Sequence, residues 1–250
     1  SPQSDTRAII LAASRGAALG GMTEDLPKCM LDIRGQPLLH RLGSTFNQEK
    51  IRKITVVRGY KKDKVNLPSI DFLDNDRFAD TGEAATLAVA AEHLEGDCIV
   101  AYGDILFRHY ILEMLSEADG DITIVVDARW RERDPDPTSR TRDLVQCSHD
   151  FQPGYLQDEP VKLQSIGADL DADKINGEWI GLAKFSGGAT AKIKDILSDL
   201  SASEKLDGAS MIDLLQAIMA LGEEVRVLYI NGHWMDVDNA SDLEDAQKFL

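Results

Sequence analysis

Short apolar runs alternate with helix-like segments through the first half of the chain, and this alternation constrains the fold most. Residues 8–13 (AIILAA), 54–57 (ITVV), 98–102 (CIVAY) and 122–126 (ITIVV) are apolar at nearly every position. Continuous runs of this kind are typical of parallel strands that are covered on both faces. The pattern predicts βαβ units and an α/β fold with a doubly wound, mostly parallel, Rossmann-like sheet.

Helical apolar spacing fills the intervals between these runs, and the second half is less regular. The other elements that we expect are helices at 37–46, 82–94 (with Thr81 as N-cap), 108–116, 191–200, 210–221 and 241–250, a short strand at 71–73, extended pieces at 143–147 and 179–185, and a strand at 225–230. The charged, proline-containing stretch 131–140 predicts a surface loop.

Composition narrows the class of protein. The 250 residues are enough to bury one substantial core, and the formal net charge of −16 argues against nucleic-acid binding, which needs excess Lys and Arg. No apolar run approaches the roughly 18 residues of a membrane span, and the polar opening 1–6 does not resemble a signal peptide. Three widely spaced cysteines, at 29, 98 and 147, favour reduced thiols and a cytoplasmic protein.

A glycine-bearing loop follows the first apolar run and spans Ser14 to Gly21. Glycine allows backbone N–H groups to approach phosphate oxygens closely. The loop lacks the Gly-Lys-Ser/Thr ending of a Walker motif, and its glycines at 16, 20 and 21 lack the spacing of a dinucleotide fingerprint. By itself, the loop fits a structural turn as well as a phosphate site.

Several further motifs follow this loop in a fixed order. They are Thr23-x-x-x-Pro27-Lys28, Val57-Arg58-Gly59-Tyr60, Tyr102-Gly103-Asp104, Gly177-Glu178-x-Ile180-Gly181 and Gly232-His233-Trp234-x-Asp236-Val237-Asp238. The ordered set resembles the nucleotidyltransferase superfamily that acts on sugar phosphates, phosphocholine and phosphonates. Within that superfamily it is most similar to the cytidylyltransferase domains associated with phosphoenolpyruvate mutase in phosphonate biosynthesis.

The resemblance implies an enzyme that transfers CMP from CTP to a small phosphonate, most plausibly 2-aminoethylphosphonate, and releases pyrophosphate with Mg²⁺ as cofactor. Phosphocholine and sugar 1-phosphates are alternative acceptors. The resemblance also implies fusion to, or association with, another enzyme of the same pathway. We expect a single nucleotidyltransferase domain over residues 1–250, with a nucleotide-binding half at 7–128 and a smaller half at 129–250 that binds the acceptor and completes the metal site.

Nucleotidyl transfer needs charge neutralisation and positioning more than it needs a protein nucleophile. The resemblance assigns catalysis to Lys28 and Arg15. It assigns nucleotide binding to these two residues and to Leu11, Ala12, Ala13, Ser14, Gly16, Gly82, Glu83, Thr86 and Asp104. Thr86 either bonds the base or packs its own helix, and the sequence leaves both possibilities open.

Carboxylates are the expected metal ligands. Asp104 follows a predicted strand at its carboxyl end, a position that suits Mg²⁺. Asp236 and Asp238 are two residues apart and would share one face of an extended strand. We therefore assign all three to the metal and favour Asp238 over Asp236 as the second ligand.

Acceptor binding is expected from the second half of the chain. Arg129 and Arg140 offer guanidinium groups for a phosphonate, and Asp169 and Glu178 offer carboxylates for an ammonium group. Trp179 either stacks on a cationic head group or packs in the core.

The chain departs from the superfamily pattern inside the loop. Ala17 and Ala18 occupy the positions where relatives carry a hydroxyl residue and a phosphate-binding arginine. We expect Arg15 or an arginine of the later loop to take over the triphosphate contact. A nucleotide-binding module without catalytic activity is the alternative that these alanines raise.

Overall fold

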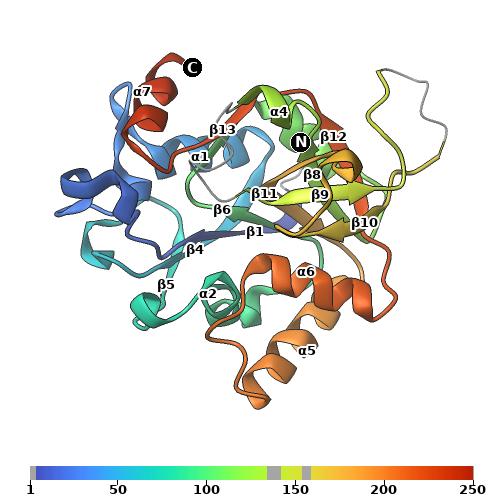
Figure 1. The fold of residues 1–250 in the computed structure, drawn as a ribbon. Helices are drawn as coiled ribbons and strands as arrows, with labels where there is room; N and C mark the ends of the chain where they lie inside the picture. Colours follow the sequence, from blue (N-terminus) through green and yellow to red (C-terminus); the bar gives the residue numbers. More distant parts are fainter. Residues whose placement is uncertain (1–3, 134–141, 154–158, 250) are drawn as a thin grey trace.

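The computed structural model describes residues 4–133, 142–153 and 159–249. Its main sheet has the strand order β10-β9-β11-β6-β1-β4-β5, with β8 beside β11 and β12 beside β8 (Figure 1). The strands are β1 Ser4–Ala12, β4 Ile51–Arg58, β5 Asp71–Asp74, β6 Cys98–Tyr102, β8 Ile122–Asp127, β9 Leu144–Cys147, β10 Leu163–Ile166, β11 Gly177–Phe185 and β12 Arg226–Ile230.

The predicted α/β class with a mostly parallel sheet is confirmed. Strand β1 pairs in parallel with both β4 and β6, β4 pairs in parallel with β5, and β12 pairs in parallel with β8. Strand β11, from the second half of the chain, lies antiparallel between β6 and β8. Strands β10 and β11 therefore run opposite to the other strands of this sheet.

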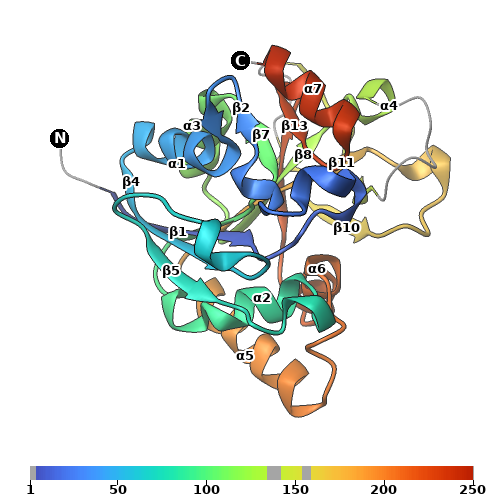
Figure 2. The same ribbon diagram turned by 90° about the vertical axis from the view of Figure 1, so that its left-hand side faces the viewer.

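Helices cover both faces of the sheet (Figures 1 and 2). Helices α1 Leu38–Gln48 and α3 His109–Ser116 lie on one face, and α2 Glu83–Val89, α5 Ala189–Ala202 and α6 Met211–Ala220 lie on the other. Ile10 of β1 belongs to the core beneath α1 and α3, whereas its neighbours Ile9 and Leu11 belong to the core against α2, α5 and α6. Burial on both faces explains why the β1 sequence is continuously apolar.

The helix after Thr81 is shorter than expected. Helix α2 ends at Val89 and is followed by a separate 3-10 turn at Ala91–His93. Its N-cap residue is Gly82, not Thr81. The Thr81 hydroxyl instead donates to the carbonyl of Arg77 at 2.8 Å and accepts from Asn75 Nδ2 at 3.0 Å.

The sequence patterns did not predict a small two-stranded ladder. Strand β7 Ile105–Phe107 pairs antiparallel with β13 Trp234–Asp236, and this pairing joins residues more than 120 positions apart. Another small ladder joins β2 Asp32–Ile33 and β3 Gln36–Pro37. Helix α7 Ala240–Phe249 contacts both β13 and β2 (Figure 2).

The remaining elements are short. Helix α4 spans Trp130–Arg133, and 3-10 turns lie at Ala17–Thr23, Lys28–Met30, Lys62–Lys64, Phe78–Asp80 and Ala172–Lys174. In the described part of the chain, no helix combines the length and the apolar composition that a membrane crossing requires. All three cysteines are buried free thiols.

Candidate active site

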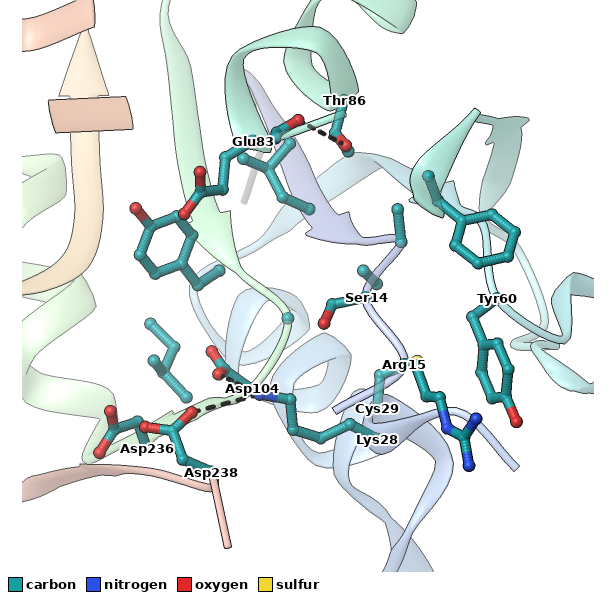
Figure 3. Close-up of a pocket in the computed structure, with 18 of the residues that line it drawn as sticks. Ser14, Arg15, Lys28, Cys29, Tyr60, Glu83, Thr86, Asp104, Asp236 and Asp238 are labelled. Atoms are coloured by element: carbon teal, nitrogen blue, oxygen red, sulfur yellow. Dashed lines mark hydrogen bonds and ion pairs between the residues drawn. The ribbon is translucent and has the colours of Figure 1, made fainter. Parts of the chain in front are cut away.

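A cavity of about 770 Å³ opens where β1, β4 and β6 end, at the carboxyl edge of the parallel strands (Figure 3). This edge is where doubly wound sheets bind ligands. Of the residues proposed from the sequence, the cavity is lined by Leu11, Ala12, Ala13, Ser14, Arg15, Lys28, Gly82, Glu83, Thr86, Asp104, Glu178, Trp179, Asp236 and Asp238. The first and second halves of the chain therefore both contribute to one cavity.

Lys28 lies at the centre of the charged network. Its side chain is only 12% exposed, and its Nζ donates to Asp104 Oδ2 at 2.9 Å and to Asp238 Oδ1 at 3.2 Å (Figure 3). Burial lowers the pKa of Lys28, but attraction to the two carboxylates outweighs burial and raises the pKa above its ordinary value. Lys28 is therefore a permanent cation.

Gly16 supports Lys28 from outside the lining. Its φ of +77° lies in the left-handed region, and a Cβ on Gly16 would lie 2.9 Å from the Lys28 Cβ. Any other residue at position 16 would be strained and would displace the lysine. Gly16 thus acts on the site through packing against Lys28, and its contact with the nucleotide stays a prediction.

The β7–β13 ladder brings the candidate metal ligands together. Asp236 pairs with Ile105 across the ladder, and the N–H of Val237 donates to the carbonyl of Asp104 at 2.9 Å. Burial raises the pKa of Asp238 to about 7, with further contributions from the nearby Asp236 and Asp104 carboxylates. Asp238 pairs with Lys28, whereas the neighbouring Asp236 forms an ion pair with Arg133.

This donor set suits a divalent cation. Asp104 and Asp238 present carboxylate oxygens to one ammonium group, at 2.9 and 3.2 Å from the Lys28 Nζ, and Asp236 lies next to them, so three carboxylates surround one cation. Carboxylate oxygens are the preferred ligands of Mg²⁺. Asp242 also lies within ligand distance of Asp236 and Asp238, but its Oδ2 accepts from the backbone N–H of Asp238 at 2.9 Å and so orders this segment.

Arg133 organises the wall of the cavity formed by the second half. Its guanidinium donates to Glu178 Oε1 at 2.9 Å, pairs with Asp236, and lies 3.8 Å from the ring centroid of Trp234. Burial raises the pKa of Glu178, and Arg133 opposes that rise. This arginine and the Glu178 carboxylate hold each other in a nearly buried ion pair.

Asp143 is a cavity residue that sequence reasoning missed. Burial raises its pKa to about 7, and the nearby Glu83 and Glu178 carboxylates add to the effect. Glu83 also has a raised pKa, again caused first by burial. No local signal marks Asp143, because it reaches the cavity only through the pairing of β9 with the first residues of β11.

The raised pKa of Asp143 predicts a pH-dependent stability difference. The folded protein holds this proton more tightly than the unfolded chain does, so the contribution of Asp143 to stability is complete below about pH 4 and is lost as the pH rises through about 7. Asp143→Asn should therefore raise the melting temperature more at pH 8 than at pH 5. The exposed Asp169→Asn is the matched control, and an Asp143→Asn effect equal at both pH values would contradict the assignment.

Two acceptor-site expectations do not match the geometry. Arg129 is exposed, pairs with Glu132 and does not line the cavity. Asp169 is also exposed and lies outside the lining. Asp143, which was not predicted from the sequence, lines the cavity instead, and Arg133 pairs with the lining residue Glu178. Arg140 falls outside the described residues.

For Trp179 and Thr86 the sequence left two roles open, contact with a ligand and packing within the protein, and their positions bear on that choice. Trp179 is 3% exposed, packs against Tyr102 with ring centroids 5.4 Å apart, and donates from Nε1 to the carbonyl of Leu182 at 3.0 Å. The Thr86 hydroxyl accepts from Asn75 Nδ2 at 3.1 Å and donates to the carbonyl of Gly82. These contacts favour packing for both side chains, although both border the cavity.

Residues 14–24, called the phosphate loop below, form the other side of the opening. The segment Ala17–Thr23 is a kinked 3-10 turn, and the buried Thr23 hydroxyl contacts the carbonyls of Gly16 and Gly20. Lys28 and Arg15 are the cations among the described lining residues. The Arg15 guanidinium lies over the ring of Tyr60, with its Cζ 5.2 Å from the ring centroid.

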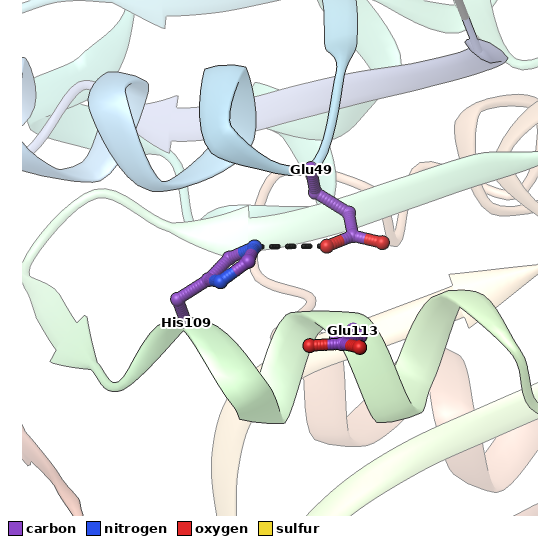
Figure 4. A group of neighbouring side chains, drawn as sticks. All are labelled: Glu49, His109 and Glu113. Atoms are coloured by element: carbon purple, nitrogen blue, oxygen red, sulfur yellow. Dashed lines mark hydrogen bonds and ion pairs between the residues drawn. The ribbon is translucent and has the colours of Figure 1, made fainter. Parts of the chain in front are cut away.

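A separate cluster of possible metal ligands lies at the contact between α1 and α3. Glu49, His109 and Glu113 place one ligand atom each within 4.8 Å of one another (Figure 4). His109 Nε2 is 2.8 Å from Glu49 Oε2, which is the length of a hydrogen bond. The direct contact accounts for this pair as a hydrogen bond between α3 and the residue that caps the end of α1.

The edge of the sheet, the phosphate loop and the buried lysine define a nucleotide-binding α/β protein. The chain belongs to the MobA-like NTP transferase domain family, whose model matches residues 8–165. It is therefore a nucleotidyltransferase.

Individual relatives extend the match to almost the whole chain. It is 27% identical to the CTP:phosphoglutamine cytidylyltransferase of Campylobacter jejuni, over 95% of this chain and 97% of the relative. It is 28% identical to the bifunctional protein GlmU of Methanococcus aeolicus, over 97% of this chain but only 54% of that protein. The chain thus spans about half the length of its GlmU relatives.

Solved structures share the fold. The inositol-1-phosphate CTP transferase from T. maritima superposes with a TM-score of 0.77 at 19% identity, covering 99% of this chain and 98% of that one. The CTP:phosphocholine cytidylyltransferase of Streptococcus pneumoniae gives a TM-score of 0.73 at 18% identity, covering 97% and 98%.

Proposed function

We propose that this chain transfers CMP from CTP to a small phosphonate that carries an ammonium group, with 2-aminoethylphosphonate as the preferred acceptor. An acceptor oxygen forms a bond to the α-phosphorus of CTP while the bond from that phosphorus to the bridging oxygen breaks, and pyrophosphate leaves. Relatives whose names specify CTP support the nucleotide choice. The observation that carries the proposal is the meeting of Lys28, Asp104 and Asp238 in a cavity with an acidic far wall.

Lys28 supplies positive charge at the reacting phosphate. Two carboxylates hold its ammonium group at a fixed point of the cavity, so little reorganisation is needed when the α-phosphate gains charge. The acceptor oxyanion is already a nucleophile, and the protein has mainly to align it and to screen its repulsion from CTP.

Asp104 and Asp238 would hold Mg²⁺, and Asp236 stands next to them. Bound there, the cation would neutralise phosphate charge. Asp236 acts chiefly on the acceptor side, because its carboxylate is held by Arg133.

The acidic wall favours an acceptor that carries an ammonium group over a sugar phosphate, whose sugar ring is uncharged. Glu83, Asp143 and Glu178 line the cavity, and only Glu178 has an arginine partner in the described structure. Burial raises the pKa of Asp143, and repulsion from Glu83 and Glu178 adds to the rise. An ammonium group of the acceptor would relieve that repulsion, whereas a sugar hydroxyl would not.

An acceptor panel tests the proposal. Pyrophosphate release would be measured with CTP, Mg²⁺ and, in turn, 2-aminoethylphosphonate, phosphocholine, phosphoglutamine and glucose 1-phosphate. We expect the highest kcat/KM with 2-aminoethylphosphonate. Asp143→Asn should raise KM for that acceptor about tenfold, or ~1.4 kcal/mol, since it removes a charge-assisted hydrogen bond.

Asp169→Asn is again the control and should leave this KM unchanged. Turnover of glucose 1-phosphate without turnover of any of the three ammonium-bearing acceptors would overturn the acceptor assignment. Stabilisation by CTP with no pyrophosphate release from any acceptor would instead support the binding-module alternative.

A further inference from the structure

Tyr60 lines the cavity, yet the reaction described above gives it no role. It follows β4, and its backbone N–H donates to the carbonyl of Ala13 at 3.0 Å. A Cβ at the preceding Gly59 would lie 2.7 Å from that same carbonyl oxygen, so glycine permits this close approach. The backbone thereby places Tyr60 beside the start of the phosphate loop (Figure 3).

The Tyr60 side chain contacts both ends of the phosphate loop. Its hydroxyl is 2.6 Å from the carbonyl oxygen of Thr23 and 2.9 Å from that of Glu24, and the one O–H donor is shared between them. Its ring lies beneath the Arg15 guanidinium and meets the ring of Phe78 edge-on, with centroids 6.0 Å apart. The Tyr60 side chain therefore contacts both Arg15, at the start of the phosphate loop, and the last two residues of the loop.

The distribution of charge in the cavity suggests what the contact between Tyr60 and Arg15 does. Lys28 is held by two carboxylates, and the described structure pairs Arg15 with an aromatic ring and with no carboxylate. Ala17 and Ala18 provide no charge to the loop. A triphosphate needs more positive charge than a monophosphate, and Arg15 is the lining cation that can supply it without first breaking an ion pair.

We propose that Tyr60 is a positioning residue for the β- and γ-phosphates of the nucleotide. Its ring orients Arg15 toward them, and its hydroxyl holds the far end of the phosphate loop in place. This inference rests on the proposed function and names the residue pair that replaces the arginine lacking at position 18. If Tyr60 positions these phosphates, its loss should weaken triphosphate binding specifically, whereas a residue that only supports the fold would affect all nucleotides alike.

The inference is tested by measuring the equilibrium binding of CTP and of CMP, each with Mg²⁺. The proteins compared are wild type, Tyr60→Leu, Tyr60→Phe, Arg15→Gln and the double variant Arg15→Gln/Tyr60→Leu. Tyr60→Leu should weaken CTP binding about fivefold, a cation–π contact being worth about 1 kcal/mol, and should leave CMP binding within about twofold. Tyr60→Phe keeps the ring and should lose less. The double variant should bind CTP no more weakly than Arg15→Gln alone, because Tyr60 acts through Arg15.

Each alternative outcome has a distinct meaning. Equal loss of CTP and CMP binding in Tyr60→Leu, or additive losses in the double variant, would overturn the positioning role. If Tyr60→Leu does not fold, as thermal unfolding would show, unchanged CTP binding in Arg15→Gln would overturn it equally. Wild-type protein that bound CTP no better than CMP would overturn the proposed function itself.

Discussion

Replacing Lys28 with methionine should lower kcat for nucleotidyl transfer by about 10² to 10³, the range found when a preorganised charge-stabilising donor is removed. The methionine side chain retains much of the lysine's length but cannot meet the charge that develops on the α-phosphate. Steady-state pyrophosphate release at saturating CTP and acceptor measures the change. The effect should fall on kcat more than on either KM, since the lysine acts most strongly in the transition state.

Lys174→Met is the matched control. Lys174 is exposed, pairs only with Asp171 in the described structure and lies outside the cavity lining, so the same substitution there should leave kcat unchanged. A Lys28→Met enzyme that retained kcat within about threefold of wild type would remove Lys28 from the catalytic centre.

Asp104→Asn is expected to have the second large effect. It removes one of the two carboxylates that Lys28 contacts, and this same carboxylate, which follows β6, is a proposed Mg²⁺ ligand, so the apparent affinity for Mg²⁺ should fall on the order of a hundredfold. Titrating the reaction rate with Mg²⁺ measures this directly. Partial recovery of the rate at high Mg²⁺ is expected, because the positions of Lys28 and Asp238 are retained.

Comparing Asp236→Asn with Asp238→Asn separates the two remaining carboxylates. Asp238→Asn should resemble Asp104→Asn in its Mg²⁺ dependence, whereas Asp236→Asn should mainly raise the acceptor KM through Arg133. A normal Mg²⁺ titration in both Asp104→Asn and Asp238→Asn would show that the metal is bound elsewhere.

The sequence predicted the fold of residues 7–128 well, because local pattern and tertiary role agree there. Strand β6 has the bounds that the CIVAY run suggested, and β1 and β4 differ from their apolar runs only at the ends. The β7–β13 ladder escaped notice because its strands have three residues each and pair across the length of the chain. Strands that short carry no periodicity to read.

The centre of the site was also readable from sequence. Lys28 follows a loop proline, and Asp104 follows a buried strand, so both positions are set by local sequence and by the edge of the sheet. Their contact with Asp238 depends on the β7–β13 ladder, yet the spacing of Asp236 and Asp238 already indicated one shared segment. Local motifs were sufficient because the segments that carry them meet at one edge.

The acceptor side could not be read in the same way. Which arginine pairs with the acidic residues of the cavity wall depends on α4, whose start is held by the buried Asp127 through the backbone N–H of Arg129. That anchor leaves Arg129 at the surface and turns Arg133 inward. Asp143 reaches the cavity through strand pairing between β9 and β11, and neither event leaves a mark in the sequence around the residue.

The central claim is that this cavity joins CMP to an ammonium-bearing phosphonate, and phosphorus NMR of the product mixture tests it most directly. Wild-type protein incubated with CTP, Mg²⁺ and 2-aminoethylphosphonate should convert the phosphonate resonance into one coupled to a second phosphorus. Inorganic pyrophosphate should appear in equal amount, and Lys28→Met should form neither product at a comparable rate. An unchanged phosphonate resonance, with coupled product formed only from glucose 1-phosphate, would contradict the claim.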